Sequence, residues 1–228
     1  VGYISYFLIG IVGLASVLAG SIVTIMRVWD GVTDPFVGMM VDKTNGKFGK
    51  NRPFMVIGNL IMAASILALY CLTPLIPASS MGLRYAAFVA LYAVWVIGYT
   101  FQTSCTRSGQ TVLTNDPKQR PTIGVWTTAF NYLVPMVMMV LLNMVLLPGF
   151  GTPVEKIVDG AVTVSYDYNQ AFLSAACWIC LAMGAIGTVL VCIGVSAFDK
   201  PENFRGTRKQ EKLKLRDMWD VLAHNRPL

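Results

Sequence analysis

Five long runs of apolar residues constrain the fold of this chain more than any other feature. They lie near residues 9–42, 53–76, 85–113, 121–147 and 170–198, and each reaches the roughly 20 residues with which a helix crosses about 30 Å of hydrocarbon. Lipid cannot pair open backbone donors and acceptors, and the runs lack the short alternating pattern of a membrane barrel. Because only 13% of the 228 residues are charged, against about 25% in soluble domains, we predict an all-α, multi-pass membrane protein.

The chain divides into a predicted bundle and a predicted tail. Residues 1–198 form the transmembrane bundle, and residues 1–8 (VGYISYFL) look like the end of a truncated first helix because they lack the basic region of a signal peptide. Residues 199–228 form a cytoplasmic loop with an amphipathic helix at an anionic membrane surface. A plain linker between two membrane halves is the alternative for this loop. The apolar face of the predicted amphipathic helix consists of Leu213, Leu215, Met218, Trp219 and Leu222.

Most of the 18 basic residues fall in three segments, 42–52, 114–120 and the tail from residue 199. Cytoplasmic loops of membrane proteins carry an excess of lysine and arginine, so these segments are predicted to lie inside the cell. The net charge of +6 therefore reflects orientation in a lipid bilayer, and we predict no nucleic-acid partner. The predicted location is the cell (inner) membrane.

The sequence offers little for catalysis. Its five cysteines lie in or beside apolar runs, which favours packing over a disulfide framework or a zinc site. It shows no cluster of metal ligands, no serine–histidine pair and no nucleotide-binding loop. We therefore predict that the protein is not an enzyme and uses no cofactor.

Three ionisable residues, Arg27, Asp30 and Asp34, interrupt the first apolar run. Asp30 and Asp34 are four residues apart and share a helical face, with Arg27 on a neighbouring stripe. Asp30 precedes the predicted cytoplasmic boundary at Asp42 by about 18 Å of helix, which places it near the middle of the hydrocarbon. Burying such a charge costs about 2.5–3.5 kcal/mol on insertion scales, so groups of this kind usually face an interior cavity.

Two carboxylates this close in a low dielectric repel each other unless a cation or a proton is shared between them. We interpret the pair as a site for sodium, lithium or hydronium, with the Thr33 hydroxyl and a neighbouring helix completing the oxygen shell. The alternative is structural: Arg27 neutralises one aspartate, and Asp34-Pro35 caps the start of a helix. That alternative leaves the second aspartate unpaired.

Two stretches of the sequence indicate a family. Residues 26–53, MRVWDGVTDPFVGMMVDKTNGKFGKNRP, and residues 98–126, GYTFQTSCTRSGQTVLTNDPKQRPTIGVW, resemble segments of the glycoside-pentoside-hexuronide:cation symporters, the melibiose/sodium symporter group of the major facilitator superfamily. The resemblance implies the N-terminal half of a 12-helix transporter, with the end of helix one and helices two to six. The closing NRPL then begins helix seven, and the remaining C-terminal half is an implied partner.

Carried onto this chain, the resemblance implies a cation site formed by Asp30, Thr33, Asp34 and the Thr100 hydroxyl, with Arg27 as their charge partner. Asp30 and Asp34 would be the metal ligands of a sodium ion. Thr33 stands where the melibiose symporter has an asparagine, so the sequence leaves the choice among Na⁺, H⁺ and Li⁺ open.

The implied sugar site differs from that of the melibiose symporter, whose aspartate, tryptophan and arginine are replaced by Thr103, Arg107 and Thr128. A different substrate follows from these replacements. Arg107 would suit a carboxylate or sulfonate, because a guanidinium binds such anions through paired hydrogen bonds. Alternatively, Arg107 reaches the cytoplasmic side or pairs with an acid of the other half.

Further polar residues of the same helix are assigned to the sugar-binding wall: Tyr99, Gln102 and Thr106. Trp95 is interpreted as a packing residue.

These inferences predict a secondary active transporter that couples a sugar, glycoside or sugar acid to Na⁺ or H⁺ by alternating access. The alternative within the same fold is a transporter of a lysolipid or another amphipathic solute. A passive channel would have no need of paired acids within the membrane.

Overall fold

The structure is a computed structural model that describes residue 9 and residues 16–44, 46, 48–113, 118–158 and 161–200. Within this part, four helical segments are long and apolar enough to cross a membrane: Arg52–Leu75, Met81–Gly109, Arg120–Phe150 and Gln170–Val195. The predicted helical, multi-pass class is thereby confirmed. The truncated first helix (residues 1–8) and the amphipathic helix of the tail lie outside the described residues.

The first apolar run forms helix α2 (Ser16–Lys43), which is continuous through Pro35. Helices α3 (Arg52–Leu67) and α4 (Met81–Leu113) follow, joined through a π-helical turn (Ala68–Leu72) and two short 3₁₀ turns, Thr73–Leu75 and Ala78–Ser80. Helix α5 (Arg120–Leu141) continues through a second π-helical turn (Leu142–Leu146) into the short α6 (Leu147–Phe150). Helix α7 (Gln170–Val195) completes the bundle.

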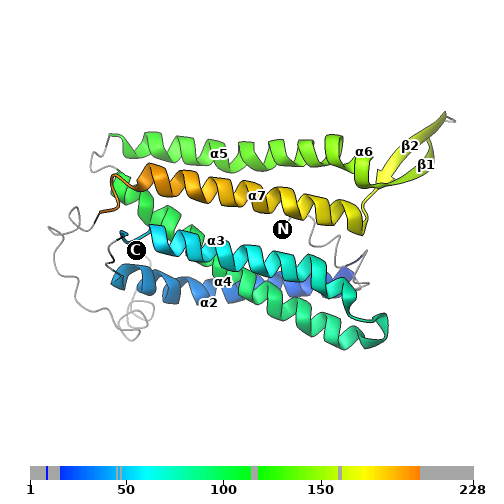
Figure 1. The fold of residues 1–228 in the computed structure, drawn as a ribbon, viewed down its shortest axis with the longest axis horizontal. Coiled ribbons are helices and arrows are strands. Elements are labelled where there is room, and N and C mark those ends of the chain that lie inside the picture. The colour runs from blue at the N-terminus through cyan, green and yellow to red at the C-terminus, as the bar shows by residue number, and fades with distance from the viewer. Residues whose placement is uncertain are drawn as a thin grey trace, which may run out of the picture.

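The helices lie side by side as an elongated bundle (Figure 1), in which α4 packs against both α2 and α3, and α7 packs against α3. Helices α2, α4 and α7 end, and α3 and α5 begin, at one end of this bundle. We call it the basic end, because Lys43, Arg52, Arg120 and Lys200 lie there. The basic segments predicted to be cytoplasmic therefore flank helix termini at the same end.

Two clusters of buried apolar side chains hold the bundle together. The one nearer the basic end joins α2, α3 and α4 through Val41, Phe54 and Phe101, with the two phenyl rings stacked at a centroid distance of 5.6 Å. The other joins α2, α4 and α7 and contains the fully buried Phe88 and Phe172. By contrast, no residue of α5 is buried.

The crossing of α3 and α4 depends on two glycines. A Cβ atom added to Gly98 would lie 2.8 Å from the carbonyl oxygen of Gly58, and one added to Gly58 would lie 2.9 Å from the carbonyl oxygen of Gly98. Small residues let helix backbones approach this closely in membranes, where close packing replaces the hydrophobic driving force.

We expect Gly98→Ala to destabilise the protein by about 1–3 kcal/mol, the usual range for overpacking, because the new methyl group meets backbone atoms that cannot rotate away. The free energy of unfolding in mixed micelles titrated with a denaturing detergent measures the effect. Gly109→Ala on the same helix is the matched control, since a Cβ there meets nothing within 4 Å. Equal stability of the two variants would contradict the close crossing.

The segment between α6 and α7 is an antiparallel hairpin of β1 (Thr152–Val158) and β2 (Ala161–Asp167), paired from Thr152 with Asp167 to Val158 with Ala161. The apolar runs of the sequence predict helices alone, so this hairpin is not among the predicted elements. Both strands are rich in β-branched residues, and Asp-Gly, a dipeptide typical of two-residue hairpin turns, stands between them in the sequence.

Side-chain hydrogen bonds connect the α3 and α7 segments at both ends of the bundle. At the end opposite the basic end, Pro74 lacks an N–H and so cannot donate to the carbonyl oxygen of Tyr70 as a helical residue would. The Gln170 side chain of α7 donates to that oxygen instead, through Nε2 at 2.8 Å. The tie thus replaces a hydrogen bond that proline removes.

At the basic end, the carboxylate of Asp199 caps the start of α3. It accepts hydrogen bonds from the backbone N–H groups of Lys50 (2.9 Å), Asn51 (3.0 Å) and Arg52 (3.1 Å). The Arg52 guanidinium donates to the Asp199 carbonyl oxygen at 2.9 Å. Asp199 is fully buried, although it is the first residue of the predicted cytoplasmic loop. Gly49 permits this approach, with φ of 90° and no room for a Cβ atom beside Asp199.

Candidate functional site

Asp30, Thr33 and Thr100 come together where α2 and α4 pack against each other. The Thr100 hydroxyl lies 3.0 Å from Oδ1 of Asp30 and 3.2 Å from the Thr33 hydroxyl. Thr100 is fully buried and Thr33 is 8% exposed, whereas Asp30 is half-buried. A carboxylate flanked by two hydroxyls offers the oxygen donors that a monovalent cation requires.

Asp34 lies one turn further along α2 and is half-buried. It makes no hydrogen bond or ion pair with any residue that the structure describes. The structural alternative for Asp34-Pro35 is wrong, because α2 starts well before Pro35 and continues to Lys43. Pro35 lies inside the helix, where its missing N–H leaves the Gly31 carbonyl without a helical donor. The Gly31 carbonyl oxygen is therefore an additional possible ligand, and Gly31 lies between Asp30 and Asp34 in the sequence.

Arg27 projects from α2 beside this cluster and is exposed. Among the described residues it forms no ion pair with Asp30 or Asp34. The described part of the structure therefore gives no support to the alternative in which Arg27 neutralises one of the aspartates.

A cavity of about 200 Å³ opens beside Asp30 and Arg27. Tyr92, Trp95 and Tyr99 of α4 form its aromatic wall, and Met26 and Val96 complete the lining. The rings of Trp95 and Tyr99 are stacked, with centroids 5.4 Å apart and an interplanar angle of 14°. The cavity thus combines an acid, a base and flat aromatic surfaces.

The aromatic wall includes Trp95, which is predicted from the sequence to be a packing residue. Nε1 of Trp95 is buried and has no hydrogen-bond partner among the described residues. A buried N–H normally has a partner, so Trp95 offers a spare donor beside the cavity. The spacing of Tyr92, Trp95 and Tyr99 at intervals of three and four residues was the available signal in the sequence.

The residues assigned to the sugar-binding wall lie in different surroundings. Tyr99 lines the cavity beside Asp30. Thr106 instead lines a separate, mostly apolar cavity of about 170 Å³ among α3, α4, α5 and α7, and the side chain of Gln102 packs near Gly58 of α3. The Thr103 hydroxyl donates to the carbonyl oxygens of its own helix. The predicted single wall therefore covers more than one face of α4.

Arg107 on α4 and Thr128 on α5 are both exposed. Neither makes a hydrogen bond or an ion pair with the residues that the structure describes. Their assignment to substrate binding stays a prediction.

Comparison with known proteins gives a consistent match. Residues 1–228 match the sequence model of the family described as MFS/sugar transport protein. The chain is 27% identical over 234 residues to an uncharacterized symporter, YnaJ, of Bacillus subtilis, covering 99% of this chain and 44% of the relative. It is 33% identical over 126 residues to a putative glycoside/cation symporter, YagG, of Escherichia coli, covering 54% of this chain and 26% of the relative.

A third relative is the lactose permease of Lactobacillus helveticus, 25% identical over 210 residues, with 91% of this chain and 31% of the relative covered. The chain thus spans less than half the length of the curated relatives it matches. The family match, by contrast, extends over all 228 residues. The chain therefore belongs to the MFS/sugar transport protein family, in the glycoside-pentoside-hexuronide:cation symporter group of the major facilitator superfamily.

Proposed function

We propose that this chain provides the cation site and part of the solute site of a symporter that couples a sugar, glycoside or sugar acid to Na⁺ or H⁺. The observation that carries the proposal is the hydrogen bond that the Thr100 hydroxyl donates to Asp30, within a bundle that contains helices of membrane-spanning length. Acids within a membrane are costly and face cavities or partners with a function. Relatives named as symporters add support.

The cation is held by the carboxylates of Asp30 and Asp34, with the hydroxyls of Thr33 and Thr100 as neutral ligands. Broken helical hydrogen bonding often exposes carbonyl oxygens to coupling ions in transporters. The Gly31 carbonyl, which loses its helical donor to Pro35, is a further ligand in this proposal.

The solute binds in the cavity lined by Arg27, Trp95 and Tyr99. Flat aromatic rings bury the apolar faces of a sugar ring, while the Trp95 N–H and the Tyr99 hydroxyl address its hydroxyl groups. Arg27 adds a positive charge that favours a glycoside carrying a carboxylate. A cavity of about 200 Å³ holds one part of such a solute, and the remainder contacts the other half of the transporter.

Coupling follows from the shared position of the two sites, because Asp30 belongs to both. A cation on Asp30 neutralises the repulsion between this carboxylate and an acidic solute, so each ligand raises the affinity for the other.

Transport by the full-length protein in proteoliposomes tests the proposal. A Na⁺ gradient and a H⁺ gradient are imposed separately, and the uptake of a labelled neutral glycoside, a hexuronide and a lysolipid is followed. The proposal predicts accumulation of the glycoside or the hexuronide that one cation gradient drives. Equilibration without accumulation would indicate a channel, and accumulation of the lysolipid alone would favour the alternative solute; either result rejects the proposal.

We expect Trp95→Phe to weaken the apparent affinity for the solute about fivefold, because one hydrogen bond of about 1 kcal/mol is lost while the aromatic surface stays. The measurement is the KM for solute uptake, and the maximal rate is expected to change little. Trp178→Phe is the matched control, since Trp178 is 61% exposed on α7. An unchanged KM in Trp95→Phe would remove this residue from the solute site.

A further inference from the structure

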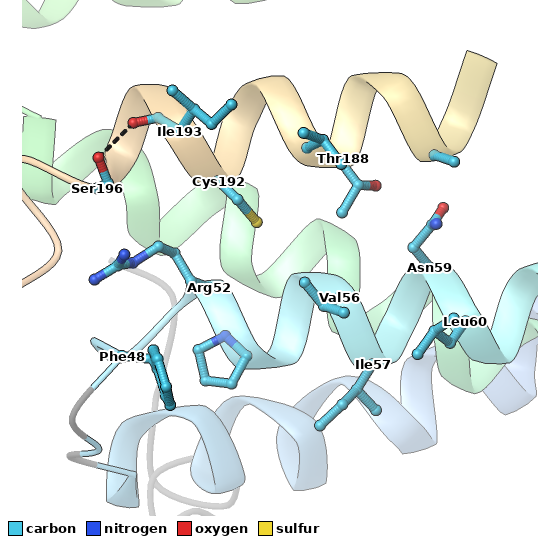
Figure 2. A pocket seen from close by; sticks show the side chains of 13 residues that line it. Phe48, Arg52, Val56, Ile57, Asn59, Leu60, Thr188, Cys192, Ile193 and Ser196 are labelled. Atoms are coloured by element: carbon cyan, nitrogen blue, oxygen red, sulfur yellow. Dashed lines mark hydrogen bonds between the residues drawn. The ribbon is translucent and has the colours of Figure 1, made fainter. Parts of the chain in front are cut away.

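A long groove runs between α3 and α7 next to the basic end (Figure 2). Its volume is about 770 Å³. Val56 and Leu60 of α3 form one wall, and Val189 and Cys192 of α7 form the other, with Arg52 at the mouth. None of these residues belongs to the cavity beside Asp30.

The walls of the groove are exposed apolar side chains on two long helices. Both of its helices are of membrane-spanning length and hydropathy. Val56, Leu60 and Val189 are 42%, 62% and 56% exposed, which in water would be an unfavourable apolar surface. An acyl chain is the natural partner of such walls, because hydrocarbon fills them without loss of hydrogen bonds.

The Arg52 guanidinium lies at the mouth of the groove, and the described residues do not occupy all of its hydrogen-bonding nitrogens. Arg52 donates through Nη2 to the carbonyl oxygen of Asp199, and its Nε lies 3.8 Å from the Asp199 carboxylate. That carboxylate already accepts three backbone N–H groups of the loop and the start of α3. The remaining guanidinium nitrogen, Nη1, makes no hydrogen bond or ion pair with a described residue. Because a guanidinium binds phosphate through paired N–H groups, the mouth is suited to a phosphate group.

We propose that an anionic phospholipid occupies this groove, with its phosphate on Arg52 and one acyl chain along Val56, Leu60 and Val189. Two other occupants fit the charge less well. The segment 201–228 of this chain carries seven basic and four acidic residues, so it would bring a net positive charge to Arg52. A second copy of the chain would bring the same basic end to the same face. The lipid site is independent of which solute the protein transports.

Native mass spectrometry of the full-length protein tests the site. The protein is delipidated, incubated with equal amounts of phosphatidylglycerol and phosphatidylcholine, and the retained lipids are counted. Phosphatidylglycerol is expected to be retained about fivefold over phosphatidylcholine, the factor that one arginine near an anionic headgroup provides. Arg52→Gln is expected to abolish this preference, and Val189→Trp, which fills the groove, to abolish the bound lipid.

Two controls keep the test specific. Lys43→Gln removes another charge of the basic end outside the groove, and Ile186→Trp adds the same indole to an exposed position of α7 that does not line it; both are expected to retain phosphatidylglycerol as the wild type does. Val189→Trp leaves the contact between Arg52 and Asp199 intact, so it tests the groove even where Arg52→Gln unfolds. Lipid retained in Val189→Trp, a preference lost equally in Lys43→Gln, or a dimer found in place of bound lipid would overturn the proposal.

Discussion

Replacing Asp34 by asparagine is expected to abolish cation-driven uptake while leaving the protein folded. Asp34 makes no hydrogen bond or ion pair with a described residue, so its charge serves the cation in this proposal and its loss breaks no described contact. Removing one partner of a desolvated charge pair costs about 2–5 kcal/mol, which corresponds to roughly thirtyfold weaker cation binding or more. Uptake of the labelled solute under an imposed cation gradient measures the loss.

Asp30→Asn is expected to have a smaller effect, because the amide oxygen of asparagine can still accept the Thr100 hydroxyl that Oδ1 of Asp30 accepts at 3.0 Å. Glu155→Gln on the β1 strand serves as the control for loss of an acidic group outside the bundle. Accumulation at the wild-type level in both aspartate variants would reject the cation site, since neither carboxylate would then be needed.

Replacing Asp199 by alanine is expected to give the largest loss of stability. The substitution leaves three backbone N–H groups at the start of α3 and the Arg52 side chain without their carboxylate. Breaking a buried charged contact of this kind costs about 3–5 kcal/mol, and a change of about 3 kcal/mol lowers the melting temperature of a chain of this size by roughly 6–12 °C. Thermal unfolding followed by tryptophan fluorescence in detergent measures it.

Two further variants separate the cap from a general effect of charge. Asp199→Asn retains one acceptor oxygen and should fall between alanine and the wild type. Lys200→Gln changes the exposed neighbouring residue and should leave the melting temperature unchanged. A Lys200 variant as unstable as Asp199→Ala would mean that the end of α7, and not the carboxylate, stabilises this region.

The helices could be predicted because their information is local. The apolar runs near 53–76, 85–113, 121–147 and 170–198 correspond to the four segments of spanning length, with boundaries shifted by a few residues. The hairpin was not predicted because residues 148–169 lie outside the apolar runs of spanning length, although the Asp-Gly between two β-branched stretches was a usable signal.

The candidate site was harder to predict because it depends on which helix lies beside which face. Helical spacing groups Tyr99, Gln102 and Thr106 on one broad stripe, but the neighbours of α4 divide that stripe between two cavities and the contact with α3. No local pattern could reveal the role of Asp199, whose backbone partners lie 147 to 149 residues earlier in the chain. Contacts of this range follow from tertiary packing alone.

Helices α3 and α7 are fastened to each other at both extremities, by Gln170 on the Tyr70 carbonyl and by Asp199 on the first amides of α3. Sliding one past the other by a single residue rise, about 1.5 Å, would distort and weaken hydrogen bonds that are now 2.8–3.1 Å long. We therefore expect the two helices to move together as one rigid unit. Rocking motions are then expected away from this pair, for example at α5, none of whose residues is buried.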